Sequence, residues 1–105
     1  MTHDYSIELV SLALDAALLR QTAIAQNVAN INTRGYQTVG VSFEDQLKNQ
    51  SIESVKPQLA LDPTHKTLDQ QIALGVQNAT HYRALVKGLN HRFALMALAV
   101  HGNQS

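Results

Sequence analysis

The chain has 105 residues, and its eight acidic and eight basic side chains give a formal net charge of zero. This length is suited to one domain, and a content of 45% hydrophobic and 15% charged residues argues against wholesale disorder. No segment concentrates basic residues, which argues against nucleic acid as a partner. Because the sequence contains no cysteine, disulfides, thiolate zinc sites and cysteine nucleophiles are excluded.

The N-terminal residues have neither the basic segment nor the continuous apolar stretch of a secretory signal peptide. No run of about 18 apolar residues occurs in the sequence. We therefore expect neither a cleaved signal peptide nor a membrane span.

The first predicted helix runs from about Tyr5 to Asn30. Mostly apolar residues step by three and four along it, which is the period of a coiled-coil seam, and they are Ile7, Val10, Leu14, Ala17, Gln21, Ile24, Val28 and Ile31. Neither Gly nor Pro interrupts the pattern. Asn30, Asn32 and Gly35 follow it as stop signals.

The middle of the chain, residues 37–66, has a different pattern. Residues 39–43 alternate between apolar and small or polar side chains, which predicts a short strand with one apolar face. The segment Glu44–Gln50 is compatible with a helical turn. The segment Ser51–Lys66 contains two prolines and shows no clear period, so we interpret it as a connector.

The second predicted helix runs from about Leu68 to His101. Its seam again steps by three and four, through Ile72, Gly75, Ala79, Tyr82, Val86, Leu89, Phe93, Met96 and Val100. Thr67, followed three residues later by Gln70, resembles a capping box at the start of this helix.

Two glycines, Gly75 and Gly88, lie inside this helix, where each costs roughly 1 kcal/mol relative to alanine. Two interpretations stay open. The glycines are tolerated weaknesses, or their missing side chains allow another helix to approach closely.

These elements predict a mainly α fold in which two long terminal amphipathic helices form a hairpin or coiled coil. The middle is short and irregular and contains at most a short strand. We divide the chain into residues 1–36, 37–66 and 67–105, which together form one structural unit. A hairpin has only one buried seam, so a further apolar row predicts an assembly surface, and it includes Leu74, Leu85, Leu95 and Leu98.

The sequence offers little chemistry. The five histidines are His3, His65, His81, His91 and His101, and none lies three or four residues from another on one helical face. There is no Gly-rich phosphate loop and no nucleophile elbow. We therefore expect no enzyme activity, no cofactor and no metal site.

The most informative local motif is the octet Ala29–Tyr36, in which two asparagines, a threonine and a glycine follow a long helix. Asn and Gly tolerate positive φ, and Asn side chains bond to nearby backbone groups. Tyr36 can fold back onto the end of the helix. Taken alone, the octet is also compatible with an ordinary helix C-cap.

Several segments together resemble the flagellar rod and hook family, and its FlgB-type proximal rod proteins in particular. These segments make up about two fifths of the chain and follow the expected order at both of its ends, and they are Ala13–Gln21, Ile24–Asn30, Asn32–Tyr36, Val41–Leu47, Asn78–Val86 and Leu89–Leu95. Two departures stand out: Arg34 replaces the proline that is usual in the family, and the middle segment is short.

The resemblance implies a structural subunit of the proximal basal-body rod that self-assembles through its terminal helices and is needed for motility. It further implies export through the flagellar secretion apparatus without a cleaved signal peptide, and a location in the periplasmic rod of the basal body. The implied partners are copies of the chain in a homo-oligomer and other rod proteins, with basal-body ring or export-gate proteins as further candidates. The alternative is a non-flagellar coiled-coil adaptor or an accessory relative of the family.

Two sets of residues carry these expectations. The family turn motif comprises Ala29, Asn30, Asn32, Thr33, Gly35 and Tyr36. The expected assembly seam comprises Ile7, Val10, Leu14, Ile24 and Val28 in the first helix, and Ile72, Tyr82, Val86, Leu89, Phe93, Met96 and Val100 in the second.

Overall fold

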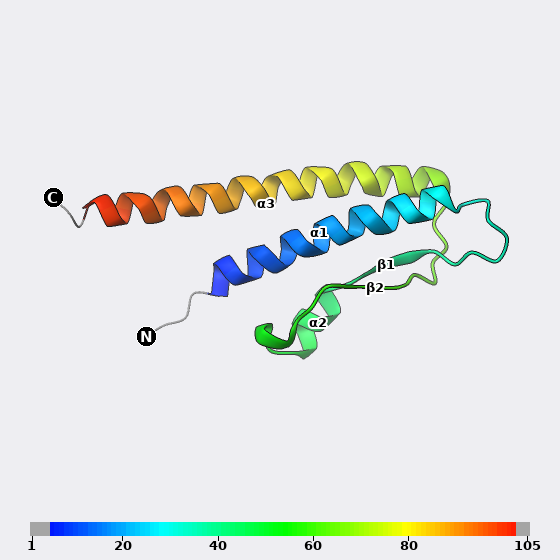
Figure 1. Cartoon of the computed structure of the whole chain (residues 1–105), viewed down its shortest axis with the longest axis horizontal. Coiled ribbons are helices and arrows are strands. Elements are labelled where there is room, and N and C mark those ends of the chain that lie inside the picture. The colour runs from blue at the N-terminus through cyan, green and yellow to red at the C-terminus, as the bar shows by residue number, and fades with distance from the viewer. Residues whose placement is uncertain (1–4, 103–105) are drawn as a thin grey trace.

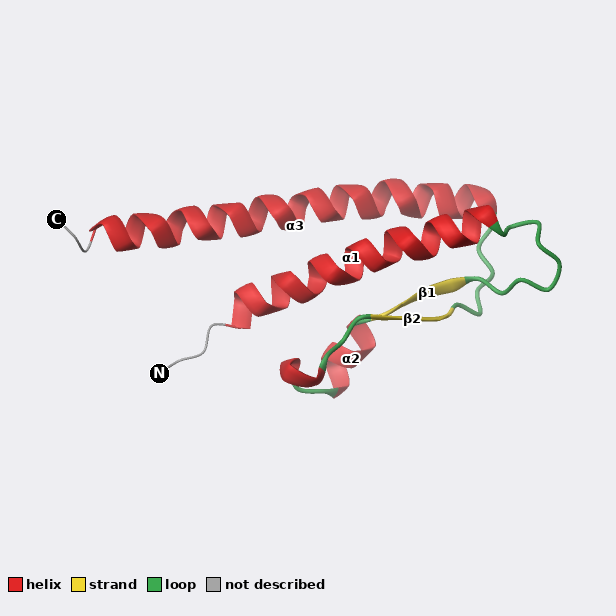
Figure 2. Ribbon diagram, viewed as in Figure 1, coloured by secondary structure: helices red, strands yellow, loops and turns green. Residues whose placement is uncertain are grey.

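A computed structural model describes residues 5–102. The elements follow the order α1 (Tyr5–Ala29), β1 (Val39–Ser42), α2 (Glu44–Asn49), the 3-10 turn η1 (Ile52–Ser54), β2 (Gln58–Leu61) and α3 (Leu68–Gly102). The two long helices run antiparallel to each other, and α1 lies between α3 and the small sheet (Figures 1 and 2). The predicted hairpin of two long terminal helices is confirmed, and both helices end within one residue of their predicted bounds.

The start of α3 has the predicted capping box. The backbone N–H of Thr67 donates to Oε1 of Gln70 over 2.8 Å, and the backbone N–H of Gln70 donates to Oγ1 of Thr67 over 3.2 Å. Each side chain thus satisfies a backbone donor that has no partner inside the helix. This local pair fixes where the helix begins.

The two helices differ in length, because α3 has 35 residues and α1 has 25. At about 1.5 Å per residue, α3 is about 52 Å long and α1 about 37 Å. In Figure 1 the C-terminal end of α3 extends beyond the start of α1. Every residue in the range 90–102 is exposed, and we call this range the α3 overhang.

A second strand was not predicted. β2 pairs antiparallel with β1, in the register that places Val39 opposite Leu61 and Val41 opposite Leu59. The segment 51–66, which we interpreted as a connector, therefore contains a strand that the sequence did not indicate. All four residues of β2 are exposed, so no burial pattern marks the strand, and its pairing with β1 is a tertiary effect.

The apolar core lies between α1 and the middle of the chain. Ala16, Phe43 and Val55 are buried together, and half-buried neighbours complete the cluster, namely Leu12, Ala13, Val41 and Leu47. Phe43 follows β1 directly, so the strand delivers its ring to the face of α1 that points away from α3. The core therefore attaches the middle of the chain to α1.

Gln46 holds the segment between α2 and β2. Its Nε2 donates to the backbone oxygen of Lys56 over 2.7 Å, and its Oε1 accepts from the backbone N–H of Lys56 over 2.8 Å. The same Nε2 also donates to the backbone oxygen of Ser42 over 3.1 Å. A single carboxamide thereby connects the end of β1 with the approach to β2.

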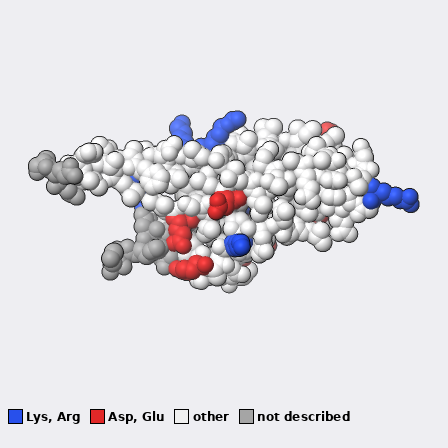
Figure 3. Space-filling model, in the orientation of Figure 1, with Lys and Arg blue, Asp and Glu red and all other residues white. Residues whose placement is uncertain are grey.

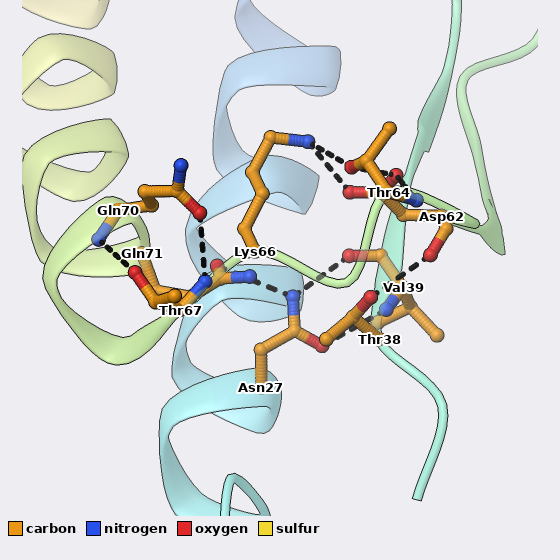
Figure 4. A network of polar contacts seen from close by, with 9 residues as sticks. All are labelled: Asn27, Thr38, Val39, Asp62, Thr64, Lys66, Thr67, Gln70 and Gln71. Carbon is orange, nitrogen blue, oxygen red and sulfur yellow. Dashed lines mark hydrogen bonds and ion pairs between the residues drawn. The ribbon is translucent and has the colours of Figure 1, made fainter.

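The turn between β2 and α3 is organised by Asp62. The backbone N–H of Asp62 donates to the oxygen of Thr38, and Oγ1 of Thr38 donates to the oxygen of Asp62, each over 2.9 Å. The carboxylate of Asp62 accepts from Nζ of Lys66 over 2.8 Å and from Oγ1 and the backbone N–H of Thr64 (Figure 4). Hydrogen bonds from Lys66 and Thr64 lower the pKa of Asp62 from 3.8 to about 2.

We expect Asp62 to make folding stability depend on acid. Because its pKa is lower in the folded chain than in the unfolded chain, its contribution is present above about pH 4 and is lost as the pH falls toward 2. Allowing for solvent screening, we expect Asp62→Asn to lower the free energy of unfolding by on the order of 1 kcal/mol at pH 7. Urea unfolding at pH 7 and near pH 2 measures the difference.

The exposed carboxylate of Asp15 on α1 provides the control. Asp15→Asn should change the unfolding free energy less than Asp62→Asn at pH 7. If Asp62→Asn lowers the free energy of unfolding as much near pH 2 as at pH 7, the ionised carboxylate of Asp62 is not the source of the stabilisation.

Candidate functional site: a polar lock and an exposed apolar helix end

Asn27 is the centre of a buried polar cluster that joins four parts of the chain. Its side chain is 2% exposed. Its Nδ2 donates to the backbone oxygen of Val39 over 2.8 Å and to Oε1 of Gln71 over 3.3 Å. Its Oδ1 accepts from the backbone N–H of Val39 over 2.9 Å and from the hydroxyl of Tyr36 over 2.8 Å. We call this cluster the Asn27 lock, and Figure 4 shows most of it.

The lock supplies β1 with a second partner. Thr38 and Asp62, which lie next to the ends of β1 and β2, form hydrogen bonds with each other. Hydrogen-bonded and non-hydrogen-bonded pairs alternate along an antiparallel ladder. The backbone N–H and C=O of the next residue, Val39, therefore point away from β2. The carboxamide of Asn27 pairs with both of those groups. It therefore takes the place of a third strand and fixes the sheet against α1.

Carboxamides also lie at the contact between α1 and α3. Nδ2 of Asn78 donates to the backbone oxygen of Ala17 over 2.8 Å and to Oε1 of Gln21 over 3.3 Å. Gln71 and Asn78 are both buried, and they are seven residues apart on one face of α3. Ala17 and Asn27 are buried residues of α1 that take part in this contact, through the backbone oxygen of Ala17 and the carboxamide of Asn27. The centre of the contact is thus made of amides and small side chains.

This arrangement corrects part of the expected seam. Ile72 is 54% exposed and Val28 is 36% exposed, so neither lies in the contact between α1 and α3. Gln71, the residue before Ile72, occupies the buried position instead. Its amide has a partner in Asn27, and this hydrogen bond selects the face of α3 that turns inward.

The other seam residues divide into two groups. Seven are half-buried within the hairpin, namely Ile7, Val10, Leu14, Ile24, Tyr82, Val86 and Leu89. Three lie on the α3 overhang and are about half exposed, namely Phe93, Met96 and Val100. The second group continues the row of the first beyond the start of α1. Its role in assembly stays a prediction.

The turn after α1 is held by its own side chains. Nδ2 of Asn30 donates to the backbone oxygen of Gln26 over 2.9 Å, and Oγ1 of Thr33 donates to Oδ1 of Asn30 over 3.2 Å. Gly35 has a φ of 77°, the left-handed conformation that the sequence suggested. Tyr36 then folds back onto α1, where its hydroxyl reaches Asn27.

The remaining members of the turn motif have simpler places. Ala29 is the last residue of α1, and Asn32 is exposed in the turn. Asn27 belongs to the segment Ile24–Asn30 that resembles the rod family, but no sequence pattern indicated its central position. Gln71 and Asn78 were also missed, and their seven-residue spacing was the available signal.

The two helical glycines differ in their surroundings. A Cβ on Gly75 would lie 3.7 Å from Cγ2 of Ile24, at the contact between the long helices. A Cβ on Gly88 would have nothing within 4 Å. Because 3.7 Å is an ordinary van der Waals distance, a side chain as small as that of alanine would fit at Gly75, and nothing within the described part of the chain accounts for Gly88.

An open groove of about 1010 Å³ lies between the sheet and α3, with α1 at its base. Its apolar lining includes Ile24, Val41, Leu61 and Leu74. Two ion pairs lie in it, Arg20 with Glu44 and Lys66 with Asp62. No pattern in the sequence indicated this groove, because β2 forms part of its wall.

Within residues 5–102 no group of three or more His, Asp or Glu side chains is placed to hold a metal ion. His65, His81, His91 and His101 are exposed, and His3 lies outside the described residues. Among the described helices, none combines the length and the apolar character that crossing a membrane requires.

We expect the two exposed glycines, Gly35 and Gly88, to respond in opposite directions to alanine. Gly35→Ala forces a Cβ into left-handed backbone and should lower the free energy of unfolding by about 1–2 kcal/mol. Gly88→Ala relieves a helix-interior glycine in open space and should raise the same quantity by up to about 1 kcal/mol. Thermal and urea unfolding measure both changes. If both substitutions change the free energy of unfolding in the same direction, the conformations described for the two glycines are contradicted.

We expect Asn27→Leu to be among the most destabilising substitutions in α1. It leaves the backbone groups of Val39 and the amide of Gln71 without their partner, at a cost of about 1–3 kcal/mol for each buried group. The free energy of unfolding should therefore fall by at least about 3 kcal/mol. The exposed neighbour gives the control, because Gln26→Leu should stay within about 0.5 kcal/mol of the parent chain. Similar losses for both variants would remove Asn27 from its central role.

One segment of the chain is similar to a known protein family. The chain matches the family model described as "Flagella basal body rod protein" over residues 11–37, which are 27 of its 105 residues. No curated protein matched the chain. The matched range includes Asn27, Gly35 and Tyr36, and so covers the α1 side of the lock and the turn. The family is a structural component of the flagellum and not a family of enzymes. Over residues 11–37 the chain is thus similar to the flagellar basal-body rod proteins.

Proposed function

We propose that the chain is a structural subunit of the proximal, FlgB-type part of the flagellar rod. In this proposal it self-assembles through its terminal helices and is needed for motility. The observation that carries the proposal is the apolar α3 overhang, which has no cover within the described chain. The family match supplies the context of the flagellar basal body.

The overhang has the composition of an interface. Phe93 and Met96 are each 48% exposed, and Leu98 is 67% exposed. Contiguous exposed apolar surface of this kind usually marks a site of protein association. At roughly 25 cal/mol per Å² of apolar surface buried, covering it would strongly favour assembly.

The rest of the hairpin suits a mechanical part. The Asn27 lock connects α1, the turn, β1 and α3 through one side chain. Gln46 and Asp62 fix the remaining connections by similar bonds. Such cross-connections resist sliding of one segment against another, as a subunit of a rotating shaft requires.

The proposed partners are copies of the chain and other rod proteins, with basal-body ring or export-gate proteins next to them. The proposed location is the periplasmic rod, reached through the flagellar export apparatus without cleavage of a signal peptide. No catalytic role is proposed.

A second candidate is an accessory relative of the rod family, or a coiled-coil adaptor outside the flagellum. The observation that favours it is the extent of the family match, which ends at residue 37. A deletion strain decides between the two candidates, because only a rod subunit is required for completed basal bodies.

We expect Phe93→Asp to abolish swimming when it replaces the parent chain in a motile strain. Phe93 is about half exposed in the hairpin, so the variant should fold with nearly unchanged stability. In an assembly that buries the ring, loss of a buried Phe side chain costs about 3–5 kcal/mol, and a buried carboxylate adds to the loss. Swimming in soft agar and electron microscopy of basal bodies give the readouts.

Asn90→Asp provides the matched control, because Asn90 is exposed one turn earlier on α3 and is already polar. This variant should swim. The Phe93→Asp subunit should still leave the cytoplasm, because export of an unfolded chain does not depend on packing. Normal swimming with Phe93→Asp would remove the overhang from the assembly surface, and failed export would assign it to secretion instead.

A further inference from the structure

Within the α3 overhang, residues 93–100 are apolar on every side of the helix. Residues 93–100 read Phe-Ala-Leu-Met-Ala-Leu-Ala-Val, without a polar side chain among them. Phe93, Met96 and Val100 form one face, while Leu95 and Leu98 lie on another, and all five are exposed. A helix that packs on one partner needs one apolar stripe, whereas a helix that is apolar all round is typically enclosed. The overhang therefore fits a concave site better than a flat helix face.

The groove between the sheet and α3 is such a concave site. Its base is α1, with Ala23 and Ile24, and its walls are the sheet and the segment of α3 that includes Leu74 and Ala84. Three sides of an inserted helix would thus meet protein. The apolar side chain of Leu61 in its wall is 68% exposed and is left without cover in the single chain.

The charges of the two surfaces are compatible. Four of the charged side chains in the groove already form the ion pairs Arg20–Glu44 and Lys66–Asp62. Residues 93–100 carry no charge. In Figure 3 charged side chains gather over the middle of the visible face, and the C-terminal end of α3 is drawn almost entirely in white. Insertion of residues 93–100 would therefore bring no charge of its own into the groove, where Asp45 is a further charged lining residue and is exposed.

We propose that the groove of one copy receives the α3 overhang of a second copy. The overhang, centred near residue 97, then lies beside the groove segment of α3, centred near residue 77. Twenty residues of helix correspond to about 30 Å, so parallel insertion displaces successive copies by about that distance along α3. The groove and the overhang are different surfaces of one chain, so the contact is heterologous. With a displacement along α3 at each step, such a contact extends as an open array instead of closing into a ring. This inference rests on the proposed self-assembly and names the two surfaces that meet.

The absence of cysteine allows a direct test by disulfide crosslinking. Gln77 lines the groove, and Gln77→Cys is combined with Ala97→Cys in one chain. Both positions are exposed, so the substitutions should leave the hairpin intact, which circular dichroism verifies. Within one helix the two positions are about 30 Å apart, far beyond the reach of a disulfide, so every bond joins two copies. We expect mild oxidation to give a ladder of dimers, trimers and larger species on a non-reducing gel.

The matched control moves one cysteine by a single residue. Val76 is 66% exposed but does not line the groove, so Val76→Cys with Ala97→Cys should crosslink at least tenfold less. Equal crosslinking of the two pairs would overturn the proposal, and so would products that stop at the dimer, which indicate a closed exchange of overhangs.

Sedimentation of the parent chain separates this inference from the proposed function. Oligomers of the parent chain, together with no disulfide product from the Gln77→Cys, Ala97→Cys variant, would overturn the groove contact and leave self-assembly standing. A monomer at every concentration would overturn both.

Discussion

The hydrogen bonds of one buried carboxamide, that of Asn27, determine how the parts of this chain fit together. An asparagine buried to this degree must find partners for both its oxygen and its nitrogen. It finds them in β1, in Tyr36 and in Gln71, which come from three separate segments. The sheet, the turn and α3 are thus positioned relative to one point on α1. A displacement of any one of them would leave buried polar groups without partners.

The amides of Gln71 and Asn78 distinguish the first half of α3 from its last turns. In its first half, hydrogen bonds to α1 define which face turns inward. Its last turns run past the start of α1 and carry apolar side chains on all sides. The hairpin is therefore specified by polar contacts within the chain, while its longest run of exposed apolar side chains lies on the overhang.

Local signals were sufficient for the long helices, the capping box of Thr67 and Gln70 and the left-handed Gly35, because each depends on residues close in sequence. The fold-back of Tyr36 also followed from its position directly after that glycine. β2 and the groove depend on pairing between segments that are distant in sequence. The four residues of β2, Gln58–Leu61, are all exposed, so no pattern of burial in the sequence indicates this pairing. The seam was misplaced at Ile72 because hydrophobic periodicity gives no weight to an amide with a buried partner.

The apolar character of the overhang has a consequence for the conditions under which copies would associate. Contacts between charges weaken with salt, whereas contacts through residues 93–100 would be nearly insensitive to ionic strength. Their strength would follow the thermodynamics of apolar hydration, so association would loosen on cooling and tighten in sulfate or phosphate. An interface of this kind would keep its stability over a wide range of salt concentration, and cooling would weaken it most.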